Sequence, residues 1–450
     1  MSELLNISVI DGRYKQKVKD FENYFSEYAL IKYRLFIELS WLKFIVEEKI
    51  IDEKLSADEI KKIDCIFNDF NINEALRIKE IESKTKHDVK SIEYYIQEKF
   101  KEINLGRLIP FIHITLTSED INNTSYNLMI NEALNNVYFD NVNELITKID
   151  KLSDEYKSIP MLGHTHGQIA TPTTVGKELK VFSYRLSSIL KLIKEVKLRS
   201  KFSGAVGNYN CHIVAYPEVD WIKETKKFIE TLGLEYNPLT TQIESHDFVC
   251  VLLSYLKILN NIIKDLNSDM WLYISKNYFH EKANKNEVGS SVMPHKVNPI
   301  NHENSMANIE ISNGLIDALV NNLSISRMQR DLSDSSKMRN LGVIFSHSLI
   351  SIKETIIGLN KIEVNEEYLN TELDSHYEVL TEAIQTILRK NKIDNAYELL
   401  KELSRGKTIT KEDITNFVNK LDINEKDKKV LLNLKPRDYI GLCEMIVENN

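Results

Sequence analysis

Residues 249–270 read VCVLLSYLKILNNIIKDLNSDM. Apolar residues recur along this stretch at alternating steps of three and four, at Val249, Leu252, Leu256, Leu259, Ile263, Leu266 and Met270. This spacing is a heptad seam, which is typical of a long helix packed almost parallel to other helices. The surrounding stretch from Leu239 to Val288 contains neither glycine nor proline. We therefore expect one long helix here, of the kind that crosses a helical bundle and often a subunit interface.

Helical spacing also dominates the rest of the chain. Further long helices are predicted over about 140–156, over about 176–199 and after Pro299, the last with apolar positions at Met306, Ile309, Leu315 and Leu319. The chain has 14 glycines and 8 prolines, fewer than the strand–helix turns of an α/β fold require. We predict an all-α protein with an N-terminal helical domain (1–115), a central long-helix bundle (116–363) and a small, charge-rich C-terminal helical domain (364–450).

Composition excludes several classes of function. The 450 residues include 58 basic and 66 acidic side chains, a net charge of −8, which argues against a nucleic-acid-binding protein. The four cysteines lie far apart, so neither a zinc site nor a disulfide framework is expected. No signal peptide and no uninterrupted apolar run of about 18 residues is visible. A soluble, cytoplasmic protein without membrane contact is predicted.

Glycine and proline gather in three clusters, at about 160–176, 204–217 and 289–299. In a helical protein these are places where the backbone leaves the helix, so they are either ordinary turns or the walls of a site. The third cluster reads GSSVMPHKVNP. Two hydroxyls beside a glycine, followed by Lys296 and Asn298, suit an anion-binding loop with an activated serine. From spacing alone, a capped helix start near Pro299 explains it equally well.

The stretch Gly289–Pro299 is similar to the signature of the fumarase/aspartase superfamily, whose members release fumarate by breaking C–N or C–O bonds. His295 within it points to the adenylosuccinate lyase branch. Four further segments resemble that branch: Asp11–Tyr14, Lys86–Lys90, Leu116–Asn123 and Gln329–Ser336 with Arg339. Residues 204–210 and 216–221 resemble its bacterial form. The resemblance therefore extends over nearly the whole chain.

The resemblance implies a β-elimination carried out by two side chains. Ser290 would be the base and His166, in Thr165-His166-Gly167, the acid that protonates the departing nitrogen. At His164 the family more often has arginine. Taken alone, a histidine in a helical protein is more often a packed or surface residue than a catalyst. No cofactor and no metal is expected, and no motif for a nucleoside triphosphate or a dinucleotide is present.

The resemblance also implies a set of substrate contacts for a purine nucleotide. Lys296, Asn298, Thr117 and Ser118 would hold the carboxylates, and Gln242 would orient the substrate. Arginine and serine suit a phosphate group, and the candidates are Arg13, Arg330, Ser335 and Arg339, with Tyr14 beside them. Lys86, His87, Asp88 and Ser291 complete the predicted contacts. His113 is given a supporting role, although its apolar neighbours in sequence suggest a satisfied core histidine.

Simpler explanations compete with these assignments. His87 and Asp88 could form a surface salt link, and scattered arginines could lie on exposed helix faces. The nearest alternative function is another lyase of the superfamily, such as an argininosuccinate lyase. Others are a non-catalytic protein that keeps the fold and a coiled-coil interaction protein. The family resemblance further implies a homotetramer with a core of long central helices and active sites that combine segments of three subunits.

Overall fold

The computed structural model describes residues 3–282, 293, 296–404 and 409–450. Helices dominate, and the strands of the described residues form three two-stranded sheets, β1–β2, β3–β4 and β5–β6. The prediction of an all-α fold is confirmed. The clearest of these sheets is a hairpin formed by β1 (Pro160–Thr165) and β2 (Gln168–Thr174) inside the first glycine–proline cluster.

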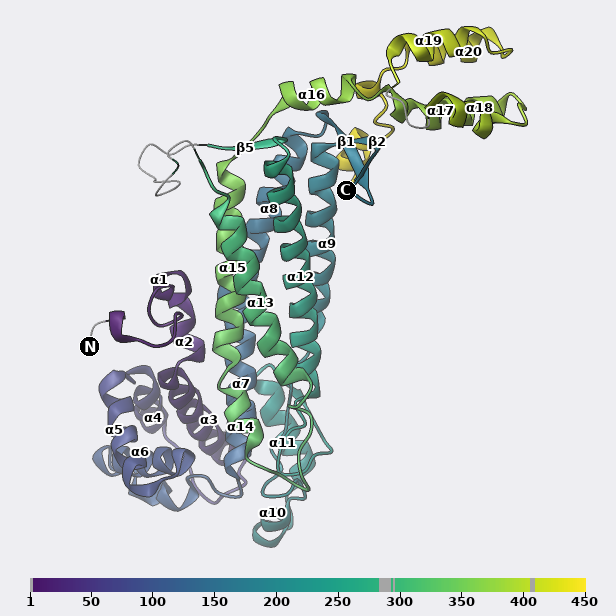
Figure 1. The fold of residues 1–450 in the computed structure, drawn as a ribbon. Helices are drawn as coiled ribbons and strands as arrows, with labels where there is room; N and C mark the ends of the chain where they lie inside the picture. Colours follow the sequence, from purple (N-terminus) through teal and green to yellow (C-terminus); the bar gives the residue numbers. More distant parts are fainter. Residues whose placement is uncertain (1–2, 283–292, 294–295, 405–408) are drawn as a thin grey trace. The chain divides into compact units, whose positions relative to one another are not determined.

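The chain divides into two compact units, and each is built from separate stretches of sequence. Unit 1 contains residues 1–142, 189–260 and 307–351, and unit 2 contains 143–188, 261–306 and 352–450. The boundaries fall inside the five longest helices outside the N-terminal region (Figure 1): α8 (Phe139–Glu155), α9 (Val175–Glu195), α12 (Asp247–Ser275), α13 (Ile300–Val320) and α15 (Leu341–Lys361). The three-domain division of the sequence stays a prediction.

The long helix α12 confirms the heptad prediction. All seven seam residues are buried, none more than 2% exposed. The helix is shorter than the glycine-free stretch, because residues at both ends adopt left-handed backbone conformations. His246, with φ of 61°, lies directly before the first turn. Asn277, with φ of 63°, ends the helix, and Tyr278 N donates to Tyr273 O at 2.9 Å, as in a Schellman motif.

Unit 1 also holds the N-terminal helices and a buried aromatic cluster. Trp41 and Phe228 lie 5.1 Å apart between ring centroids, and Phe202 lies within 4.9 Å of both. Burying such large rings is a main source of stability for this unit. Its remaining elements are α1 (Lys15–Val18), α2 (Glu22–Phe25), α3 (Glu27–Glu47), α4 (Ala57–Asn68), α5 (Ile72–Thr85), α6 (Asp88–Glu102), α7 (Ser118–Ala133), α10 (Asn210–Ala215), α11 (Trp221–Thr231), α14 (Ser333–Met338), β3 (Arg199–Ser200) and β4 (Glu235–Tyr236).

Unit 2 ends in short helices, as the C-terminal sequence predicted. Ile384, Leu388, Val418 and Leu431 form a small core of their own there. The loop expected at Ser404–Lys407 lies largely outside the described residues. Besides the β1–β2 hairpin and the long helices, the helices and strands of unit 2 include α16 (Glu366–Asp374), α17 (Thr381–Lys390), α18 (Ala396–Ser404), α19 (Lys411–Asn419), α20 (Glu425–Asn433), α21 (Cys443–Glu448), β5 (Phe279–Glu281) and β6 (Ile362–Val364).

Polar side chains interrupt the apolar seams between α12, α13 and α15. In unit 2, Asn267 donates to Thr355 Oγ1 at 2.8 Å, and His302 Nδ1 lies 2.7 Å from Asn267 Oδ1. In unit 1, Ser348 donates to Asn260 Oδ1 at 2.6 Å. All five side chains are buried. Buried polar contacts of this kind specify one register between parallel helices, because any shift leaves their atoms unpaired.

One stretch, Ser333–Lys361, is long and apolar enough to cross a membrane by length and composition. However, 72% of its most apolar window is buried inside the protein, as in the core helix of a globular protein.

Candidate functional site

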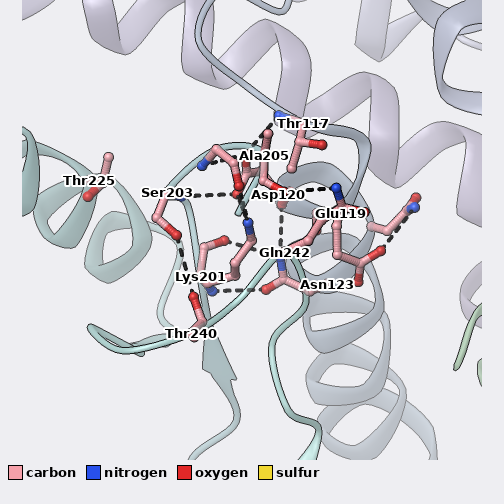
Figure 2. A network of polar contacts seen from close by, with 12 residues as sticks. Thr117, Glu119, Asp120, Asn123, Lys201, Ser203, Ala205, Thr225, Thr240 and Gln242 are labelled. Carbon is pink, nitrogen blue, oxygen red and sulfur yellow. Dashed lines mark hydrogen bonds and ion pairs between the residues drawn. The ribbon is translucent and has the colours of Figure 1, made fainter. Parts of the chain in front are cut away.

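The start of α7 carries Thr117 and Ser118 and is held by a buried ion pair. Asp120, in the first turn, accepts a hydrogen bond from Thr117 N at 2.8 Å. Lys201 Nζ lies 2.9 Å from Asp120 Oδ1, and both side chains are completely buried. Asn123 Nδ2 donates to Lys201 O at 3.1 Å and Asn123 Oδ1 accepts from Lys201 N at 3.0 Å, so several hydrogen bonds join α7 to the segment around Lys201 (Figure 2). The backbone of the predicted carboxylate-binding segment is therefore fixed.

The loop after Lys201 closes over the same carboxylate. Asp120 also accepts from Ser203 N at 3.0 Å and from Gly204 N at 3.1 Å. Gly204 and Gly207 have φ of 79° and 81°, the left-handed region in which glycine avoids a steric penalty. A Cβ at Gly207 would come within 2.3 Å of Thr240 O, so this glycine allows the loop to approach the segment that carries Gln242.

Gln242 and Arg330, predicted separately as substrate contacts, touch each other. Arg330 Nη1 donates to Gln242 Oε1 at 3.1 Å, and Gln242 Nε2 donates to Ala205 O at 2.8 Å. Arg330 Nη2 lies 3.3 Å from Glu119 Oε2, one residue after Ser118. An open surface cleft is lined by Gln242 and residues 328–332. The structure thus brings together segments that are 88 residues apart in sequence.

Behind this cleft lies a buried cluster that sequence analysis did not assign, formed by Glu119, His246 and Asp334. Each offers one oxygen or nitrogen within 4.8 Å of the others. His246 Nε2 lies 3.7 Å from Asp334 Oδ2, which is too long for a hydrogen bond. One imidazole nitrogen and two carboxylates are side-chain groups that can serve as ligands of a divalent cation such as zinc. Arg330 beside Glu119 already supplies positive charge to the cluster.

Burial controls the protonation of this cluster. It raises the pKa of Glu119 to about 7, although His246 and Arg330 act in the opposite direction. Burial lowers the pKa of His246, but Asp334, Glu244 and Glu119 outweigh it, so that the pKa is raised overall. Burial raises the pKa of Asp334, but His246 and the backbone of Ser335 bring it below its usual value. A protonated His246 between carboxylates is the arrangement that these directions favour.

Asp88 and Arg339, two further predicted contacts, also meet. Arg339 Nη2 lies 3.2 Å from Asp88 Oδ2, and the buried Arg34 binds the same oxygen at 2.8 Å. Burial raises the pKa of Asp88, but Arg34 and other partners lower it by a larger amount. The pKa is therefore below its usual value, and the carboxylate stays ionised. Arg339 also binds Glu27 at 2.6 Å. The surface salt link expected between His87 and Asp88 is weak, with 3.9 Å between Nδ1 and Oδ1.

His87 instead caps a helix. Its Nδ1 accepts a hydrogen bond from Lys90 N at 3.1 Å at the start of α6. Lys86, in the left-handed conformation with φ of 55°, ends α5. Arg13 is exposed and Tyr14 half-buried, both directly before α1. Ser335 is half-buried in α14, next to Asp334.

His113 is paired and mostly buried, as a satisfied histidine would be, but the apolar surroundings that its sequence neighbours suggest are in error. Its Nδ1 lies 2.7 Å from Glu38 Oε1, and its Nε2 lies 4.0 Å from Glu93 Oε1. Burial lowers the pKa of His113, but the charge and hydrogen bond of Glu38, followed by Glu93, raise it to about 9. The error arises because these carboxylates come from α3 and α6, remote in sequence from the apolar neighbours of His113.

In unit 2, His166 lies at the tip of the β1–β2 hairpin. Thr165 pairs with Gln168, so His166 and Gly167 form a two-residue turn with φ of 53° and 72°. Two positive φ values match a type I′ turn, the form that fits the twist of a hairpin. His166 is exposed. His164 lies lower on β1, where its ring is 6.1 Å from that of Tyr278, and burial lowers its pKa.

The signature loop is described only in part. Ser290 and Ser291 lie outside the described residues, as does His295. Lys296 is exposed and Asn298 half-buried, just before α13 begins at Ile300. Sequence analysis missed Glu38, Arg34, Lys201, Glu119, His246 and Asp334. Three of these, Glu119, His246 and Asp334, lie within four residues of a predicted contact. Their closeness in sequence to those contacts was the signal that could have identified them.

Comparison with known proteins identifies the family. A lyase family model matches residues 12–310, and a model described as the adenylosuccinate lyase C-terminal matches residues 326–440. The chain is 44% identical over 451 residues to adenylosuccinate lyase of Escherichia coli K12, covering 100% of this chain and 99% of that protein. It is 46% identical to the Legionella pneumophila Philadelphia 1 enzyme of the same name, again over 100% and 99%.

Solved structures agree on the fold. Fumarate lyase from Mesorhizobium sp. BNC1 aligns with a TM-score of 0.77 at 18% identity, covering 96% of this chain and 97% of that one. The 3-carboxy-cis,cis-muconate lactonizing enzyme from Pseudomonas putida aligns with a TM-score of 0.75 at 16% identity, covering 97% of each chain. These two likenesses establish the fold alone. By the family models and the full-length identities, the chain belongs to the adenylosuccinate lyase family of the fumarase/aspartase superfamily.

Proposed function

We propose that this chain, a C–N lyase, eliminates fumarate from adenylosuccinate to give AMP. The same reaction on the succinylated aminoimidazole carboxamide ribotide places it twice in purine biosynthesis. The observation that carries the proposal is the contact of Arg330 with Gln242 and Glu119 at the cleft of unit 1. It brings a group suited to a nucleotide phosphate next to a segment suited to the succinyl carboxylates.

The reaction moves one proton off carbon and one onto nitrogen. Ser290, as an alkoxide, takes a proton from the carbon next to a succinyl carboxylate. The electron pair left there gives a carbanion stabilised by that carboxylate, to which Lys296 and Asn298 supply a positive charge and hydrogen bonds. The C–N bond then breaks as the C=C bond of fumarate forms. His166 donates the proton that the departing nitrogen needs.

Substrate contacts divide between the two ends of the molecule. Thr117 and Ser118 bind carboxylate oxygens at the start of α7, where backbone N–H groups favour negative charge. Arg330, Arg339, Arg13 and Ser335, with Tyr14, bind the phosphate end, since guanidinium groups bind phosphate through paired hydrogen bonds. Gln242 orients the substrate. Lys86, His87, Asp88 and Ser291 complete the contacts, and His113 supports them through its ion pair with Glu38.

Assembly into a homotetramer follows from the same proposal. An acid at an exposed hairpin tip must be enclosed before it works in a water-poor site. The long helices carry apolar side chains that a single chain leaves exposed, including Tyr184 on α9 and Ile258 and Leu272 on α12. Exposed apolar stripes on long helices mark subunit interfaces. We place the assembled enzyme in the cytoplasm.

The first test measures fumarate release from adenylosuccinate by the purified wild type and by Ser290→Ala. Ser83→Ala, an exposed serine on α5, is the matched control. We expect release by the wild type and the control and a loss of about 10²-fold or more in the Ser290 variant. Release from argininosuccinate but not from adenylosuccinate would transfer the chain to another branch of the superfamily.

The tetramer is tested separately with Ile258→Glu combined with Tyr184→Glu. Light scattering reports the mass in solution, and the fumarate assay reports activity on the same sample. We expect smaller particles with little activity. A dissociated variant with full activity would contradict the shared active site.

A further inference from the structure

Three segments that bear predicted substrate contacts converge on the buried cluster of Glu119, His246 and Asp334. Glu119 directly follows Ser118, and Asp334 directly precedes Ser335. His246 ends the loop that begins at Gln242 and immediately precedes α12. Each cluster residue therefore belongs to a different segment, and none of the three is itself among the predicted contacts. The cluster lies where the segments are joined.

These side chains have few other partners, which makes the junction specific. Glu119, His246 and Asp334 are 3%, 2% and 5% exposed. Among the described residues, His246 Nε2 and Asp334 Oδ1 have no hydrogen-bond partner. Buried polar atoms of this kind are stabilised chiefly by the charges opposite them. Any movement of one segment away from the others would remove that compensation.

The charges around His246 come from every segment packed against it. Asp334 lies 3.7 Å away, Glu244 lies 4.0 Å away on the same loop, and Glu119 faces it from α7. Arg330 closes the cluster by binding Glu119 at 3.3 Å and Gln242 at 3.1 Å. Three acidic side chains thus surround a histidine and an arginine.

We propose that Glu119, His246 and Asp334 are positioning residues that set the spacing between the carboxylate-binding segment (117–118) and the phosphate-binding segment (330–335). This proposal rests on the proposed function, since it assigns the two segments to the two ends of one substrate. The cluster makes the enzyme recognise its substrate by length. A ligand that carries both a succinyl group and a nucleotide phosphate fits only when the spacing is right.

The physical basis is the gain from binding both ends of one molecule. When one end is bound, the second end meets its site at a high effective concentration, provided that the distance matches. A shift of about 1 Å between the segments costs up to about 10²-fold in such a two-ended interaction. A ligand that occupies one segment, such as AMP without the succinyl group, does not depend on the spacing.

The test compares the two kinds of ligand in Glu119→Gln, His246→Gln and Asp334→Asn. One assay of fumarate release gives kcat, KM for adenylosuccinate and the inhibition constant of AMP. We expect KM to rise about tenfold in each variant, while kcat changes much less. The AMP inhibition constant should stay within about twofold of the wild type. A general loss of structure would weaken both ligands together.

Asp427→Asn is the matched control, because Asp427 is also a buried carboxylate but lies in α20 of unit 2. Its kinetic constants should equal those of the wild type. Thermal unfolding of every variant shows whether it folds. If these three variants fail to fold, Glu119→Asp keeps the carboxyl group and shortens the side chain by one methylene. It should show the same split between adenylosuccinate and AMP.

Equal weakening of adenylosuccinate and AMP, or unchanged constants in folded variants, would overturn the proposal. So would a fall in kcat at constant KM, which would place the cluster in the chemical step. Stoichiometric zinc in the purified enzyme, whose removal reproduces the variant kinetics, would replace the positioning cluster by a metal site. Failure of the proposed function is distinct, because the wild type itself would then release no fumarate from adenylosuccinate.

Discussion

The start of α7 in unit 1 and the tip of the β1–β2 hairpin in unit 2 hold predicted site residues in opposite ways. Thr117 and Ser118 are fixed by Asp120, which binds three backbone N–H groups and a buried lysine. His166 stands exposed in a two-residue turn. The contacts that fix the first region lie within one unit of the chain, whereas those that would enclose the second must come from elsewhere.

This difference separates stability from activity. The residues predicted to bind substrate at α7 share their contacts with the core, so a substitution there should affect both folding and catalysis. An exposed turn residue contributes little to the stability of the folded state. Replacing it therefore changes only the rate of the reaction.

Replacing His166 by alanine should affect activity alone. Removing a general acid lowers kcat/KM by about 10²- to 10⁴-fold. The midpoint of thermal unfolding should stay close to that of the wild type, because His166 is exposed. Fumarate release and calorimetry on the same preparation test this, with Gln168→Ala, an exposed residue of the same hairpin, as the control. A large drop in stability would mean that the tip is part of the folded core.

Replacing Asp120 by alanine should lower both the stability and the activity of the protein. It leaves the buried Lys201 without a counter-charge, which costs about 3–5 kcal/mol in the free energy of unfolding. It also frees the backbone of Thr117, so KM for adenylosuccinate should rise in whatever protein folds. Denaturant unfolding measures the first effect. Asp154→Ala removes an exposed pair with Lys157 and should leave the free energy of unfolding almost unchanged. Similar losses in the two variants would contradict the bracing role of Asp120.

The ion pair of His113 predicts a pH dependence confined to unit 1. Its folded pKa of about 9 lies above the usual value of 6.5. The pair therefore contributes full stability below about pH 6.5, and this contribution is lost as the pH rises through 9. The loss is on the order of 3 kcal/mol by linkage. We expect the unfolding free energies of wild type and His113→Gln to converge between pH 6.5 and 9. Parallel curves would show that Glu38 does not keep His113 protonated in this pH range.

Two glycines, Gly358 in unit 2 and Gly314 in unit 1, test how tightly the long helices pack away from the hairpin. A Cβ at Gly358 in α15 would meet the buried ring of His302 at 2.8 Å, so Gly358→Ala should destabilise by about 1–3 kcal/mol. Gly314 in α13 has open space around it, and Gly314→Ala should stabilise by about 0.5–1 kcal/mol through helix propensity. Urea unfolding of both variants measures the difference. Equal effects would mean that His302 moves aside without cost.

Sequence reasoning reached features that rest on local pattern. The seam from Val249 to Met270 was readable because helical spacing repeats without any knowledge of neighbouring helices. The ends of this helix could not be predicted, since they depend on left-handed backbone conformations at His246 and Asn277. A glycine beside His166 suggested a turn, and the structure adds that it belongs to a hairpin.

The candidate site was predicted as a set of residues but not as an arrangement. Nothing in the spacing indicates that Arg330 reaches Gln242 or that Glu38 reaches His113, since such pairs are separated by tens of residues. The charged cluster behind the cleft was missed for the same reason. The roles of Ser290 and Ser291 stay predictions that depend on the family resemblance.

The division of the chain into discontinuous units has a consequence for how it folds during synthesis. Unit 1 draws on residues as late as 351, and unit 2 begins at 143. A growing chain that has passed residue 142 therefore lacks two of the three stretches that build unit 1. Folding driven by such distant contacts is slow, and unfinished helices expose apolar seams meanwhile. Nascent chains that end between residues 142 and 351 should therefore depend most strongly on chaperones.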